Sequence, residues 1–182
     1  MKLGIQTTTL DLDPNGQVTE TKPFDHVTKE SVERILPEFI GKIMQVPPIF
    51  SALKKDGKRL HEEARKGKTE EELGIEAREV EIFDLKMLPF DEMGEGLPSC
   101  FGLEVECGGG TYVRSLVRDI AKKLGTVGTM SSLIRTKQGL FEVEHCLSKE
   151  DWTPENIYQA IEQSNNILLS RGEDKAPITE ES

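Results

Sequence analysis

The sequence has no long hydrophobic run and few cysteines. No stretch approaches the roughly 20 consecutive apolar residues that cross a bilayer, and the first residues lack the apolar core of a secretory signal. The 3 cysteines form no CxxC pair, which argues against a disulfide framework and against a cysteine zinc site. We therefore expect an intracellular protein with no membrane partner, in a compartment (nucleus, cytoplasm or mitochondrion) that the sequence does not specify.

Basic residues are outnumbered, with 23 Lys and Arg against 33 Asp and Glu and a net charge of -10. This balance excludes indiscriminate attraction to a phosphate backbone, because neutralising phosphates requires concentrated Lys and Arg. The basic residues are nevertheless unevenly distributed, and one short stretch contains Lys54, Lys55, Lys58, Arg59, Arg65, Lys66 and Lys68. A chain that is acidic overall can therefore present one basic face to a nucleic acid.

Metal and nucleotide sites are not indicated either. The 3 histidines have no ligand spacing, and the glycine run at 108–110 lacks both the Lys-Ser/Thr ending of a P-loop and the GxGxxG pattern. Glycines between a strand and a helix could cradle a phosphate or simply form a tight turn. A tight turn does not account for Tyr112 and Arg114 in the first helical turn, where a ring could stack on a base and a guanidinium could pair with a carboxylate or phosphate.

Hydrophobic periodicity predicts alternating strands and helices. The strongest pattern is a helix over Tyr112–Leu124, which has one apolar stripe and ends at Gly125. Further helices are expected after Thr28, with a kink at Pro37, around 58–66 and from 153 onward. Alternation and turn residues predict strands at 1–9, 17–21, 42–46, 78–88, 100–107, 131–136 and 141–145.

Four segments of the sequence, in order, resemble motifs of the TruB-type tRNA pseudouridine synthases (tRNA pseudouridine-55 synthases), and their wording is similar to the eukaryotic branch. The first resembles the family's LGxxTxTxDxxG segment, and the four lie at 3–16, 45–54, 110–116 and 133–139. The resemblance implies an α/β (α+β) fold, a pseudouridine synthase-like mixed, mainly antiparallel sheet with helices packed against it, incomplete at the N-terminus. It also implies conversion of a uridine to pseudouridine in the T-loop of tRNA, without cofactor or metal.

The resemblance assigns roles to individual residues. Asp11 matches an active-site acid that joins Arg114 in a network holding the catalytic carboxylate ionised, since a nearby guanidinium favours the charged form. Tyr112 matches the ring that stacks on the target base, and Leu133 matches the apolar residue that packs near it. The expected contacts with the tRNA T-arm come from Lys54, Lys55, Lys58 and Arg59.

The family's catalytic aspartate lies in a GGTLDPxAxG motif that these 182 residues do not contain. Asp13 follows a TLDP-like string, but its flanks align with the later strand segment, so we do not assign it as the nucleophile. The resemblance thus predicts an N-terminally truncated synthase domain over 1–168, inactive alone and monomeric, followed by a disordered acidic tail over 169–182. The alternatives are a non-catalytic RNA-binding module and a structural or interaction protein with no RNA role.

Overall fold

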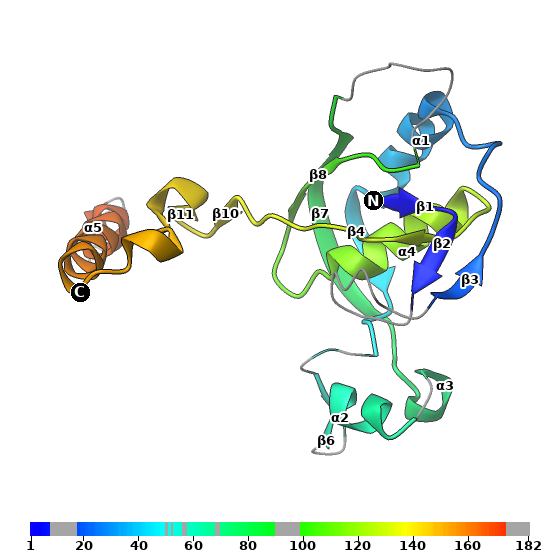
Figure 1. Cartoon of the computed structure of the whole chain (residues 1–182), viewed down its shortest axis with the longest axis horizontal. Coiled ribbons are helices and arrows are strands. Elements are labelled where there is room, and N and C mark those ends of the chain that lie inside the picture. The colour runs from blue at the N-terminus through cyan, green and yellow to red at the C-terminus, as the bar shows by residue number, and fades with distance from the viewer. Residues whose placement is uncertain are drawn as a thin grey trace, which may run out of the picture. The chain divides into compact units, whose positions relative to one another are not determined.

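The structure, a computed structural model, forms two compact units, Met1–Leu133 and Ile134–Ser182 (Figure 1). The boundary after Leu133 lies inside the synthase domain that is expected over 1–168, and the end of that domain stays a prediction. The described residues are 1–7, 18–49, 51, 53–55, 58–67, 70–89 and 99–173.

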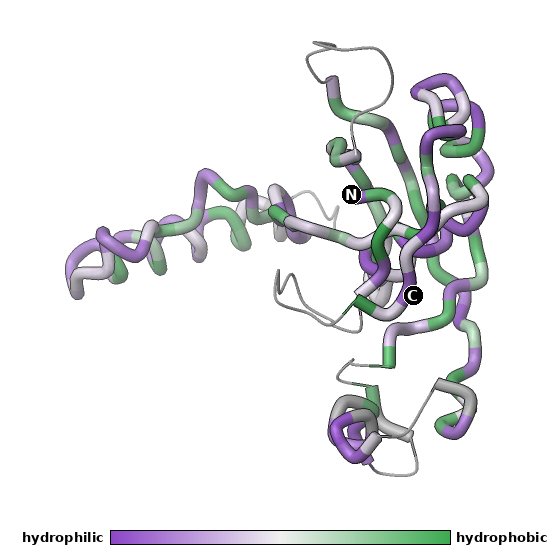
Figure 2. Tube along the Cα trace, turned by 45° about the vertical axis from the view of Figure 1, so that its right-hand side comes forward, coloured by the Kyte–Doolittle hydropathy of each residue, from purple (hydrophilic) through white to green (hydrophobic). Residues whose placement is uncertain are grey.

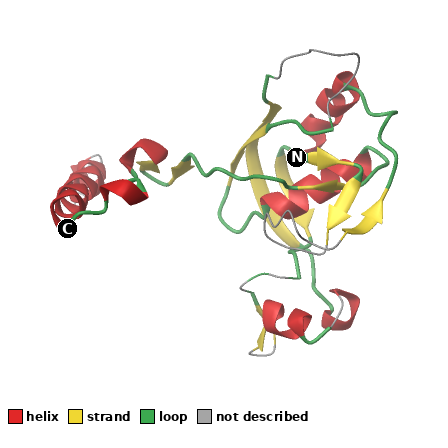
Figure 3. Cartoon of the chain, in the orientation of Figure 1, coloured by secondary structure: helices red, strands yellow, loops and turns green. Residues whose placement is uncertain are grey.

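Every strand pair in the described part of the first unit is antiparallel, as Figure 3 shows in outline. The largest sheet has three strands in the order β4-β7-β8. Two-stranded pairs join β1 to β9, β2 to β3 and β5 to β6. The strands are β1 (Lys2–Leu3), β2 (Ile5–Thr7), β3 (Val18–Thr21), β4 (Gly41–Gln45), β5 (Lys54–Lys55), β6 (Lys58–Arg59), β7 (Arg78–Met87), β8 (Leu103–Cys107) and β9 (Gly128–Thr129). The expected α/β fold with mainly antiparallel pairing is confirmed.

Helix α4 (Val113–Lys123) supplies four of the buried residues of the core of this unit, and Figure 1 shows it in the middle of the surrounding strands. Its spacing places one apolar stripe inward, and the buried members of that stripe are Leu116, Val117, Ile120 and Ala121. This stripe packs with Leu3 of β1 and Ile82 of β7 in one hydrophobic cluster. The helix ends at Lys123, and Gly125, which follows the C-cap Leu124, has a φ of +76°, the left-handed conformation that glycine adopts most easily.

The first helix of the unit has the predicted cap. Thr28 accepts a hydrogen bond from the backbone of Ser31, and the Ser31 hydroxyl accepts one from the backbone of Thr28, so α1 (Lys29–Ile35) begins with a capping box. A 3-10 turn, η1 (Leu36–Phe39), follows and contains Pro37, where the kink is expected. Val32 and Leu36 enter the shared core, so this helical arm covers part of the same cluster.

The described residues between 46 and 77 form a lobe that is inserted between two paired strands. The last residue of β4 and the first residue of β7 are register partners, Gln45↔Arg78, so the lobe leaves and rejoins the body at one point. The lobe contains the hairpin β5–β6 and the short helices α2 (Leu60–Arg65) and α3 (Glu70–Leu73). Leu60 and Leu73 are buried in the lobe, and neither belongs to the hydrophobic cluster around α4.

The second unit is a small hairpin followed by helices. Its elements are β10 (Lys137–Gln138), β11 (Phe141–Glu142), the 3-10 turns η2 (Val143–His145) and η3 (Lys149–Asp151), and α5 (Pro154–Glu173). Apolar and polar residues alternate along this unit (Figure 2). Helix α5 continues to Glu173, beyond the expected start of the tail at 169, and residues 174–182 lie outside the described part.

The expected strand over Ser131–Thr136 is wrong. Pairing in this region begins only at Lys137, beside a turn in which Gly139 has a φ of +62°. In an antiparallel hairpin, the paired residues lie directly on either side of the turn. Here the pairs are Lys137 with Glu142 and Gln138 with Phe141, so pairing begins next to the turn and not earlier in the chain. Residues 131–136 are consequently exposed and unassigned to any strand.

Candidate functional site

Two of the four motif segments meet where β4 ends and α4 begins. The side chain of Gln45 is buried, with 1% of its surface exposed. Its Oε1 accepts a hydrogen bond of 2.8 Å from the backbone N–H of Tyr112, the N-cap residue of α4. Residues 67 positions apart in the sequence are thereby in direct contact.

The next residue of the same segment strengthens this junction. The carbonyl of Val46 accepts a hydrogen bond of 2.8 Å from Ser115 Oγ and one of 3.1 Å from Arg118 Nη2. Arg118 is held in turn by Asp119, with 3.2 Å between Nε and Oδ1. The first turns of α4 are therefore fixed to the point where the chain leaves the body for the lobe.

The predicted active-site residues fall into two groups. Tyr112 and Arg114 lie together at the start of α4, both are partly buried, and Arg114 has an interaction partner in the protein. Leu133 ends the first unit with 45% of its surface exposed. Asp11 lies outside the described residues, so its pairing with Arg114 stays a prediction, as does the packing of Leu133 near a base.

The four predicted RNA-binding residues form one hairpin. The register pairs Lys54 with Arg59 and Lys55 with Lys58, which brings all four backbones side by side. Lys58 and Arg59 are exposed, and the side chains of Lys54 and Lys55 lie outside the described part. We call these residues the basic hairpin.

Two exposed lysines of the three-stranded sheet are neutralised by neighbouring acids. Lys42 of β4 lies 3.0 Å from Glu79 of β7, and the hydrogen bond to Glu79, together with its charge, raises the pKa of Lys42 above its usual value. Lys86 lies 3.2 Å from Glu104, which raises its pKa in the same way. These two cations are less available to phosphates, whereas no ion pair of Lys58 or Arg59 is seen within the described residues.

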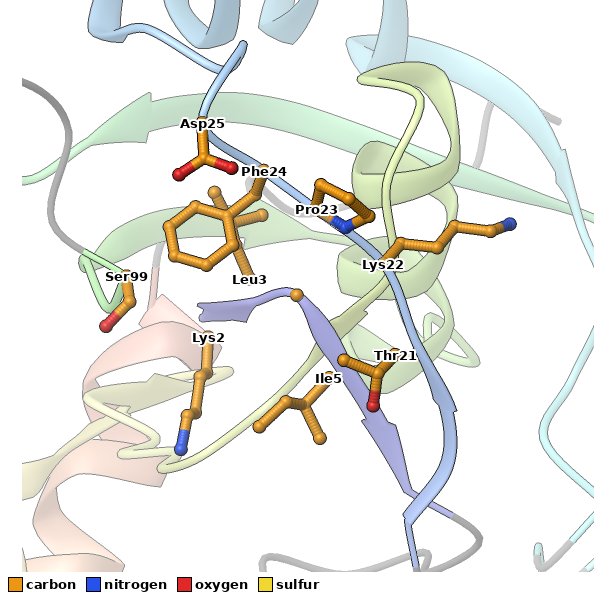
Figure 4. A pocket seen from close by; sticks show the side chains of 10 residues that line it. Lys2, Leu3, Ile5, Thr21, Lys22, Pro23, Phe24, Asp25 and Ser99 are labelled. Carbon is orange, nitrogen blue, oxygen red and sulfur yellow. The ribbon is translucent and has the colours of Figure 1, made fainter.

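A cavity of about 580 Å³ lies elsewhere in the first unit. Its wall includes Leu3, Ile5 and Phe24, and none of the predicted site residues lines it. Figure 4 shows the Phe24 ring beside Leu3, while the amino groups of Lys2 and Lys22 point away from it. Sequence reasoning missed this hollow, because strand β1 and the segment after β3 meet only in the fold.

Within the part of the chain that the structure describes, no group of three or more His, Cys, Asp or Glu side chains is arranged to hold a metal ion. Among the same residues, none of the helices is both long enough and apolar enough to cross a bilayer.

A solved structure shares this arrangement of strands and helices. The chain aligns with one chain of a crystallised Cbf5–Nop10–Gar1 complex at a TM-score of 0.52 and 25% identity, over 77% of this chain and 34% of the other. Both are α/β proteins of one fold class. The sequence model of the TruB family pseudouridylate synthase (N-terminal domain) matches residues 1–113. This chain belongs to the TruB family of pseudouridine synthases, which confirms the resemblance.

Individual relatives agree with this membership. The chain is 46% identical to the pseudouridylate synthase TRUB1 of Mus musculus, over 92% of this chain and 47% of the relative. It is 43% identical to a tRNA pseudouridine synthase B of Caldanaerobacter subterraneus, over 81% of this chain and 48% of the relative. The chain thus spans about half the length of the curated relatives it matches.

Proposed function

We propose that this chain holds the T-arm of a tRNA inside the cell and takes part in converting a T-loop uridine to pseudouridine. Family membership supports the reaction class, and the names of the bacterial relatives support tRNA as the substrate. The observation that carries the proposal is the hydrogen bond between Gln45 and Tyr112. It joins the root of the lobe that carries the basic hairpin to the residues proposed to receive the base.

On this proposal, one group of residues binds the RNA and another takes part in the reaction. The exposed cations of the basic hairpin neutralise backbone phosphates and set the position of the RNA without reading its sequence. A uridine displaced from the loop then stacks on Tyr112, with Leu133 excluding water beside it. Arg114 and Asp11 form the charged network that orients an attacking carboxylate. The isomerisation detaches the base from its sugar and rejoins it through carbon, and no step requires a metal or cofactor.

We further propose that the attacking carboxylate comes from outside these 182 residues, because the GGTLDPxAxG motif is not among them. On this proposal the chain, as a monomer, binds RNA but forms no pseudouridine by itself. The alternative is a non-catalytic RNA-binding module, which would use the same grip and never complete an active site.

One experiment separates these possibilities. The 182-residue chain is titrated into a fluorescent T-arm stem-loop at low salt, with an anticodon stem-loop of equal length as control, and the RNA is then assayed for pseudouridine. We expect preference for the T-arm and no product. Fusing the motif-containing segment of the bacterial relative ahead of Met1 should produce pseudouridine. Absence of T-arm binding refutes the proposal, and binding without product from the fusion supports the non-catalytic module.

A further inference from the structure

Gln45 occupies an unusual place in the fold. It is the last residue of β4, and its register partner Arg78 is the first residue of β7, so the lobe of residues 46–77 joins the body beside it. The same side chain contacts the backbone at the start of α4. One residue therefore touches both the joint of the RNA-gripping lobe and the proposed base-stacking residue.

The Gln45 carboxamide is poorly explained as core packing. Its Nε2 is buried and, within the described residues, has no hydrogen-bond partner. A buried amide that leaves one donor unpaired destabilises a protein relative to an apolar side chain of similar volume, such as methionine. The carboxamide does make one bond, from the N–H of Tyr112 to its Oε1. That bond explains why a polar side chain occupies this buried position, which packing alone does not explain.

Tyr112 needs such a bond because little else fixes it from the N-terminal side. Three glycines precede it closely, and Gly110 has a φ of +86°, so the backbone leading into Tyr112 is intrinsically permissive. Tyr112 is the N-cap of α4, yet its side chain makes no capping hydrogen bond. Its carbonyl accepts the N–H of Leu116 at 3.0 Å, so helix and Gln45 together clamp both polar groups of its peptide backbone.

We propose that Gln45 is a positioning residue, which aims the ring of Tyr112 at the displaced uridine through this single hydrogen bond. The inference rests on the proposed function and deepens it. Removing the bond leaves the basic hairpin and its grip on phosphates intact, but it lets the start of α4 drift. Loss of the bond should therefore reduce capture of the displaced base but not the affinity for the RNA.

The test measures both quantities on the full chain, using a T-arm stem-loop with 2-aminopurine beside the target uridine. A titration of this RNA followed by fluorescence anisotropy reports affinity. The 2-aminopurine fluorescence intensity reports displacement of the neighbouring uridine. Gln45→Met should keep affinity within about twofold but reduce the displaced population about fivefold or more, the lower end of the value of one base–aromatic stack. Tyr112→Ala should behave alike, and Gln45→Glu, which retains an acceptor oxygen, should restore the signal.

Val32→Ala, which removes buried methyl groups from α1, controls for loss of stability alone and should not separate the two readouts. An unchanged 2-aminopurine signal in Gln45→Met overturns the inference while leaving the proposed function standing. Absence of RNA binding by the wild-type chain overturns the proposed function itself. Should Gln45→Met fail to fold, hydrogen exchange of the wild-type chain decides: the Tyr112 amide must be protected, and exchange at the rate of a free amide overturns the inference.

Discussion

The basic hairpin and the outer face of the β4–β7–β8 sheet allow a matched comparison of equal charge changes. Lys58→Ala with Arg59→Ala removes two exposed cations for which, within the described residues, no ion pair is seen. Lys42→Ala with Lys86→Ala removes two cations that are also exposed but are already bound to carboxylates. The net charge changes by the same amount in both double variants, so any difference in RNA binding reports position and not total charge.

The size of the effect follows from counterion release. Each phosphate contact contributes about 0.7–0.9 to the slope of log affinity against log salt. Losing two contacts should therefore lower the slope by about 1.4–1.8. If these contacts contribute nothing at 1 M salt, the variant should bind about 25- to 60-fold more weakly than the wild-type chain at 0.1 M salt, one logarithmic unit lower. Fluorescence anisotropy with the T-arm stem-loop at several salt concentrations measures both the slope and the affinity.

The sheet variant is the control, because its lysines are engaged by Glu79 and Glu104 and should contribute little to the slope. Equal losses in the two double variants would refute a localised grip and leave only a general effect of net charge. An unchanged slope in the hairpin variant would remove the basic hairpin from the RNA interface.

Three stability predictions follow from the fold, each measured by urea unfolding of the full chain. Thr28→Ala removes the cap of α1 and should cost about 1 kcal/mol. Leu116→Ala opens a cavity at a side chain that is fully buried and should cost about 2–5 kcal/mol, whereas a loss below about 1 kcal/mol would contradict its place in the core. Gly4→Ala should cost about 1–3 kcal/mol, because Gly4 has a φ of +80° and the new Cβ would lie 2.7 Å from the Phe24 ring. Gly109→Ala meets no atom within 4 Å and serves as its control, with an expected change below about 0.5 kcal/mol.

Local patterns predict the elements of this fold well. The helix expected over Tyr112–Leu124 is α4, and the strand expected over 78–88 is β7, because apolar residues recur at the helical or strand period in each. The Thr28 cap is confirmed for the same reason, since capping depends on residues three positions apart. The Ser131–Thr136 strand fails because a strand needs a partner, and the position of the turn at Gly139 determines where pairing starts.

The site is less predictable than the elements, because its contacts are non-local. The resemblance brings Tyr112 and Arg114 to attention, but no periodicity indicates that Gln45 reaches the Tyr112 backbone across 67 positions. The sequence signal for Gln45 is a polar residue at the end of a strand that is expected to be buried. This signal does not indicate which residue Gln45 contacts. The basic hairpin is easier to predict from the sequence, because its four cations are close together in the chain. The structure adds only the strand pairing between them.

The lobe begins and ends on paired residues of adjacent antiparallel strands, and such partners have Cα atoms about 4.5–5.5 Å apart. A tight two-residue turn bridges that gap equally well, so the strand register of the body does not depend on what the chain does between its two anchor points. On the proposed function, RNA binding by the lobe and folding of the body are therefore separable. Exchanging the segment between the two anchor points for one of another length or charge should change RNA preference and leave the hydrophobic interior as it is.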